Sequence, residues 1–97
     1  MEYEFDGEVI EWRGPSPFYY VVVPDAISAE IKDMANQLTY GWGVIPVTVV
    51  IGKTEYTTSL FPREGLYYLG VKADVRKREG ISLGDHVEAT MRLAFAF

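Results

Sequence analysis

The chain begins with side chains that alternate between polar and apolar character over residues 2–9. One face carries four acids, which are Glu2, Glu4, Asp6 and Glu8. The opposite face carries Tyr3, Phe5, Gly7 and Val9. Because successive side chains of a strand point to opposite faces, the pattern predicts a half-buried strand with an acidic outer face. The alternation breaks at Val9–Ile10, where we expect a bulge that turns Ile10 and Trp12 inward.

The next apolar run, residues 18–23, is rich in aromatic and β-branched side chains. It predicts a central strand that is covered on both faces. Pro24 cannot continue that strand, and Asp25 can cap a helix that follows. Apolar residues then recur at the spacing of one helix face, at Ile27, Ile31, Met34 and Leu38. The helical region ends in a loop at residues 41–43.

The middle of the chain predicts a hairpin between residues 44–51 and 54–61. Gly52-Lys53 suits a two-residue type II′ turn, which fixes the register of the two strands. The expected partners are Ile45 with Leu60, Val47 with Thr58, and Val49 with Tyr56. A second turn, a fifth strand and a short helix follow at residues 62–65, 66–72 and 74–79. Renewed alternation from Val87 to Phe97 predicts the last strand.

The resulting order, β-β-α-β-β-β-α-β, predicts a mainly β protein with two short helices. Six short strands separated by frequent turns favour a small β-barrel over a parallel sheet. A chain of 97 residues forms one compact domain, so we expect a single domain over residues 1–97.

Composition narrows the classes of protein that need consideration. The chain has no cysteine, which excludes disulfides and thiol chemistry and fits a reducing cytoplasm. No apolar stretch approaches the ~20 residues that span a bilayer, and the acidic start does not resemble a signal peptide. We therefore expect a soluble, cytoplasmic protein without membrane contact. A formal net charge of −5 opposes bulk attraction to nucleic acid.

Several segments in this order resemble a prokaryotic domain family of unknown function, some longer members of which continue into a bacteriocin-protection-type segment. The segments are Trp12, Val23-Pro24, Gly41 to Val47, Ile51-Gly52, Thr58 to Pro62, Tyr68-Leu69, Val71-Lys72, Val75 to Lys77, Gly80-Ile81 and Gly84-Asp85. Gly70 departs from the pattern. The resemblance implies a double-split β-barrel like that of AbrB-type regulators and MazE-type antitoxins. Residues 75–85 are similar to the swapped hairpins of those proteins. It supplies no catalytic or ligand residues.

The residue types needed for catalysis or metal binding are sparse. The one histidine, His86, falls on the outward face of the last strand. With no cysteine beside it, a zinc site lacks ligands. The alternate acids of residues 2–8 lie ~7 Å apart, too far for one ion without further ligands. Gly52-Lys53-Thr54 resembles the end of a P-loop but joins two strands. We therefore expect no catalytic residue, metal or cofactor.

The distribution of charged and aromatic residues says more about a possible binding site than the residue types used in catalysis or metal binding. Residues 1–33 carry eight acids and two bases, whereas residues 63–78 carry five bases and two acids. This predicts an acidic side and a small basic patch, which either holds an anion or is only the exposed side of a short helix. Four aromatic residues, Trp12, Tyr40, Tyr67 and Tyr68, either form a pocket at one barrel mouth with Trp42 or cap the core.

These observations favour a non-catalytic binding module that holds an anionic small molecule or a protein partner. The residues expected to bind the ligand are Trp42, Lys72, Arg76 and Lys77. The first alternative is an AbrB-like nucleic-acid-binding regulator, which the acidic charge opposes. The second is a small enzyme that uses carboxylate acid–base chemistry. A homodimer is compatible with a barrel of this size.

Overall fold

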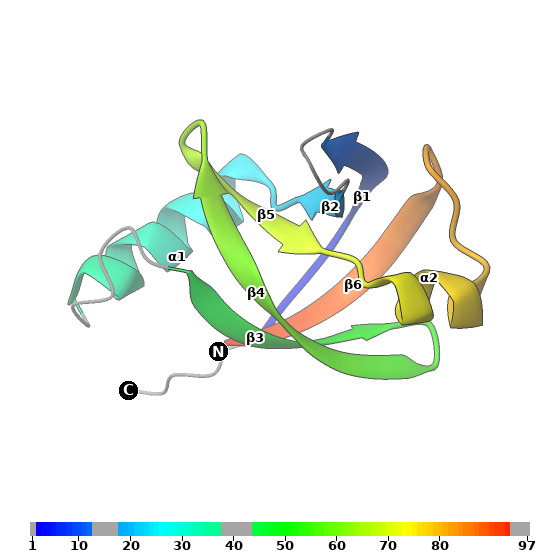
Figure 1. The fold of residues 1–97 in the computed structure, drawn as a ribbon. Helices are drawn as coiled ribbons and strands as arrows, with labels where there is room; N and C mark the ends of the chain where they lie inside the picture. The colour runs from blue at the N-terminus through cyan, green and yellow to red at the C-terminus, as the bar shows by residue number, and fades with distance from the viewer. Residues whose placement is uncertain (1, 13–17, 38–43, 94–97) are drawn as a thin grey trace.

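The computed structural model describes residues 2–12, 18–37 and 44–93. Its elements follow the predicted order: β1 (Glu2–Trp12), β2 (Phe18–Val22), α1 (Asp25–Gln37), β3 (Ile45–Ile51), β4 (Thr54–Arg63), β5 (Leu66–Gly70), α2 (Ala73–Glu79) and β6 (His86–Leu93). The strands form a closed antiparallel barrel in the order β1-β2-β5-β4-β3-β6. Figure 1 shows α1 and α2 on opposite sides of the strands. The predicted fold class is confirmed.

The barrel interior is formed by alternate residues of the strands. On β1 the predicted alternation holds, because Phe5 and Val9 are buried and the four acids between and around them are exposed. On β6 the inward residues are Val87, Ala89, Met91 and Leu93. No helix within the described ranges is long and apolar enough to cross a membrane.

The second half of β1 departs from the prediction. The strand pairs with β6 from Glu2 to Glu8 and with β2 from Val9 to Trp12, without the expected inward turn. Trp12 lies opposite Phe18, and these side chains are 47% and 53% exposed. The expectations of an inward Trp12 and of a second strand covered on both faces are therefore wrong. Aromatic content identified the strand but not the side on which its rings lie.

Each of the two hairpin turns places a glycine at positive φ. The β3–β4 register is the predicted one, from Ile45 opposite Leu60 to Ile51 opposite Thr54. Gly52 adopts φ 60° in the turn between them. In the β4–β5 turn, Glu64 and Gly65 both have positive φ, 51° and 80°, as a type I′ turn requires.

A buried serine attaches α1 to the barrel. The Ser28 hydroxyl donates to the Val23 carbonyl at 3.0 Å and accepts from the Tyr67 amide at 3.2 Å. The Val23 amide in turn donates to the Tyr67 carbonyl. Since a buried polar group without a partner costs ~1–3 kcal/mol, the hydroxyl stabilises the junction of β2, α1 and β5.

A tyrosine bridges the region where β4 separates from β5. The described ladder between these strands begins at Leu60, and Tyr56 lies four residues earlier on β4. The Tyr56 hydroxyl donates to the Gly70 carbonyl at 2.9 Å, and burial raises its pKa. The side chain thus gives a partner to a carbonyl that the ladder does not reach.

The short helix α2 is held against the β3–β4 hairpin. Val75 is buried in the core, and Thr54 Oγ1 donates to Glu79 Oε2 at 2.6 Å. A Cβ added at Gly52 would overlap Glu79 Oε1, at the end of a flexible side chain that would have to move. The positive φ therefore favours glycine at this position, and the contact with Glu79 adds a smaller constraint.

We expect Gly52→Ala to destabilise the protein by about 1 kcal/mol more than Gly65→Ala, as measured by chemical denaturation. Both substitutions place an alanine at positive φ, but a Cβ at Gly65 meets nothing within 4 Å. The additional cost at Gly52 arises because Glu79 must move and lose its hydrogen bond to Thr54. In a Glu79→Ala background the difference between the two substitutions should shrink, because the contact with Glu79 is gone. A difference that is unchanged there would contradict this explanation.

Candidate functional site

The structure brings together two of the four predicted ligand-binding residues. Arg76 and Lys77 line one cleft beside α2. Lys72 is the exposed N-cap residue of that helix and is not part of the cleft lining. Trp42 lies outside the described residues. The binding role of all four stays a prediction.

The cleft beside α2, which we call the basic cleft, has a volume of about 390 Å³. It is lined by Tyr19, Ala73, Arg76, Lys77, Ile81, Ser82 and Leu83. One wall is α2, another is the loop that follows it, and the third is the Tyr19 ring of β2. The lining therefore combines two cations, a hydroxyl and apolar side chains.

The fold fixes the direction of Arg76. Its Cζ lies over the Tyr19 ring, 3.7 Å from the centroid. Gly80 ends α2 with φ 65°, and the Ile81 amide donates to the Arg76 carbonyl at 2.8 Å. This left-handed end turns the chain so that Ile81 and Ser82 face the helix.

The electrostatics of the basic cleft favour an anion. Among the described residues, no carboxylate forms an ion pair with Arg76 or Lys77. The nearby Asp85 carboxylate accepts a hydrogen bond from the Ser82 amide at 2.8 Å. No side chain in the described part of the chain accepts a hydrogen bond from the stacked Arg76 guanidinium, so its N–H groups can donate to a carboxylate or phosphate.

A second cleft, which we call the aromatic cleft, lies on the outer wall of the barrel. Its volume is about 420 Å³, and it is lined by Trp12, Phe18, Tyr20, Phe61, Pro62, Arg63 and Tyr68. Of the five large hydrophobic residues that are exposed in the described part of the chain, three belong to it. Tyr20 is 5% exposed and forms the floor, with the Phe18, Phe61 and Tyr68 rings around it.

Sequence reasoning found this cleft only in part. Trp12 and Tyr68 line it, as a pocket of aromatic residues would require. Tyr67 instead faces the core, and Tyr40 lies outside the described residues. Phe61 and Arg63 were missed because the β4–β5 register that carries them to Tyr68 was not predicted.

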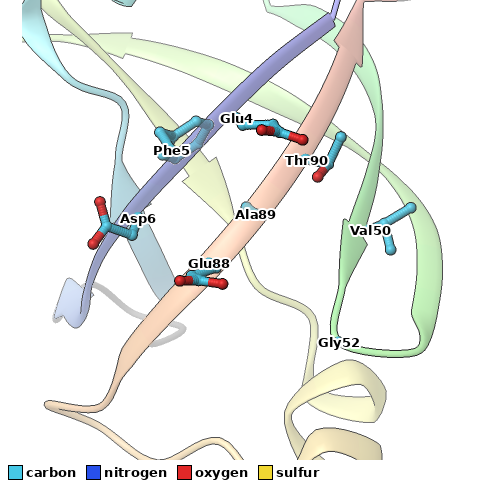
Figure 2. A pocket seen from close by; sticks show the side chains of 8 residues that line it. All are labelled: Glu4, Phe5, Asp6, Val50, Gly52, Glu88, Ala89 and Thr90. Atoms are coloured by element: carbon cyan, nitrogen blue, oxygen red, sulfur yellow. The ribbon is translucent and has the colours of Figure 1, made fainter.

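A third hollow follows the acidic face of β1 and β6 and has a volume of about 600 Å³. Figure 2 shows Glu4 and Asp6 on β1, Glu88 and Thr90 on β6, and Val50 on β3 around it. Asp6 lies opposite Glu88 in the ladder, where like charges repel. Among the residues that the structure describes, no group of three potential ligands could hold a metal ion.

His86 offsets part of this repulsion. Its Nε2 lies 2.5 Å from Asp6 Oδ2, and both side chains are largely exposed. The hydrogen bond and charge of His86 lower the pKa of the Asp6 carboxyl. Within residues 2–12, 18–37 and 44–93, no hydroxyl forms a hydrogen bond with His86, so this exposed pair lacks the third member of a nucleophilic triad there.

One family model matches most of the described chain. The model of a family described as "Domain of unknown function (DUF1905)" matches residues 5–91, from β1 into β6. A search of curated proteins finds no match.

We expect His86→Ala to raise the Asp6 pKa toward its ordinary value of 3.8. Because the folded-state pKa is lowered, the interaction stabilises the protein above the unfolded-state pKa. That stabilisation is lost as the pH falls through the folded-state pKa. Carboxyl-detected NMR titration of the wild type and the variant measures the change. An unchanged Asp6 pKa in the variant would show that the contact does not form in solution.

Proposed function

We propose that this chain, which belongs to the DUF1905 family, is a non-catalytic binding module for an anionic small molecule. The family description names no activity, so the proposal rests on the chemistry of the basic cleft. The observation that carries it is the Arg76 guanidinium, held 3.7 Å from the Tyr19 ring centroid beside Lys77 without a carboxylate partner among the described residues. Trp42 and Lys72 stay predicted contributors to the site.

The arrangement suits a small anion with a modest apolar part. The volume of the basic cleft falls within the ~300–1,000 Å³ of small-molecule sites. Arg76 can supply paired donors to a carboxylate or phosphate, while Lys77 adds a second charge. Leu83, which is 53% exposed, offers apolar contact to the remainder of the ligand.

An AbrB-like nucleic-acid-binding regulator is the first alternative. Arg76, Lys77 and the exposed Arg78 would contact phosphates in such a protein. The acidic faces of β1 and β6 and the net charge of −5 oppose it. Retardation of duplex DNA by micromolar protein, weakened steeply by salt, would favour this alternative over the small-molecule proposal.

An enzyme that uses carboxylate acid–base chemistry is the second alternative. A general acid needs a raised pKa near the working pH. The pKa of Asp6, which lies in the acidic hollow, is instead lowered by His86. This opposes a role for Asp6 as a general acid.

Three finer features are also proposals. We propose that the barrel is of the double-split type found in AbrB- and MazE-like proteins, supported by the separation of β4 from β5 before Leu60. Location in the cytoplasm is supported by the absence of cysteine. A bacteriocin-protection-type segment in longer relatives and a homodimer stay predictions.

We expect Arg76→Gln to weaken the binding of inorganic pyrophosphate about tenfold, because a charge-assisted hydrogen bond contributes ~1.5–3 kcal/mol. Titration followed by amide NMR measures the affinity and should shift Tyr19, Lys77 and Ser82. Arg78→Gln is the matched control, since it removes the same charge from an exposed position of α2 outside the cleft. Equal losses in both variants, or no binding of pyrophosphate at millimolar concentration, would reject the proposal.

A further inference from the structure

We propose that the aromatic cleft is a second binding site, for a small molecule that combines a planar aromatic ring with one anionic group. This goes beyond the anion site of the basic cleft and uses other residues. Phe18 and Tyr20 face outward from β2, whereas Tyr19 between them packs toward the core side. The two clefts therefore lie on opposite faces of one strand.

The apolar half of the proposed site consists of rings that the fold leaves uncovered. Phe18 is 53% exposed and Phe61 is 41% exposed. Their ring centroids lie 6.1 Å and 6.3 Å, respectively, from the centroid of the buried Tyr20 ring. Tyr20 and Tyr68 meet edge to face at 5.7 Å. These ring contacts with Tyr20 favour the observed arrangement, which offers exposed ring faces to a planar ligand.

Arg63 supplies the polar half. Its Cζ lies over the Trp12 ring, 3.8 Å from the centroid, at the edge of the cleft. No described carboxylate pairs with it, and no acidic residue lines the cleft. Glu64, the next residue, occupies the left-handed turn position and is not part of the lining. Arg63 is the one cation among the described residues of the lining, and beside their apolar surface it is complementary to a ligand with one negative group.

The charge also argues against a second copy of the chain as the occupant. A two-fold interface centred on the cleft would place it against itself and bring Arg63 toward the partner's Arg63. None of the described residues that line the cleft is a carboxylate that could compensate the two cations. A concave volume of about 420 Å³ is, in addition, of small-molecule size.

Two matched dyes test the proposal on the intact protein. Anilinonaphthalene sulfonate carries the anionic group, and N-phenylnaphthylamine has the same rings without it. In a Trp42→Phe background Trp12 is the only tryptophan, so its fluorescence reports binding at the cleft. We expect Arg63→Gln to weaken binding of the sulfonate dye about tenfold and binding of the neutral dye less than twofold. Phe61→Thr should weaken the binding of both dyes.

Control variants distinguish dye binding at the aromatic cleft from a nonspecific effect of protein charge and from binding at the basic cleft. Arg78→Gln and Arg76→Gln should leave the affinity of both dyes unchanged, whereas Arg63→Gln should leave pyrophosphate binding unchanged. Phe18→Thr repeats the apolar test at a more exposed position, in case Phe61→Thr fails to fold. Equal effects of Arg63→Gln and Arg78→Gln would overturn the proposal. So would a dimer that Phe18→Thr converts to a monomer while neither dye binds.

Discussion

The barrel closes because β1 pairs with two different strands along its length. Its first half pairs with β6 and its second half with β2. Gly7 lies near this exchange, and a Cβ there would approach Val21 Cγ1 to 2.7 Å. The absence of a side chain thus lets β1 and β2 come together. The first half of β1 presents acidic side chains on the outside of the barrel, and the second half presents Trp12. The barrel therefore carries an acidic surface and an aromatic surface along one strand.

The fold was largely predictable because its signals are local. Alternation in residues 2–9, the glycine of the β3–β4 turn and the spacing from Ile27 to Met34 each act within one element. The outer rings were harder to place. Phe61 lies opposite Tyr68 only because of the β4–β5 register. Arg63 contacts Trp12 although the two residues lie on β4 and β1, which are not neighbours in the barrel. Such contacts depend on how strands pair over long sequence distances, which no local pattern encodes.

The same pairing of groups recurs at the two proposed sites. In each, an arginine from one element lies over an aromatic ring of the β1–β2 hairpin: Arg63 over Trp12 and Arg76 over Tyr19. The ring restricts the long side chain and contributes ~0.5–2 kcal/mol of cation–π attraction. The guanidinium is thereby oriented before a ligand arrives, which lowers the entropy lost on binding.

Closure of the sheet has a further consequence for recognition. Each strand of the described barrel has a neighbour on both sides along part of its length. Within the described ladders, residues 2–8 of β1 pair with β6 alone, and residues 54–59 of β4 pair with β3 alone. An incoming chain could therefore add a strand only beside these one-sided stretches. Where both neighbours are paired, recognition rests on side chains, and the outer wall can change its ligands by substitution while the ladder hydrogen bonds stay in place.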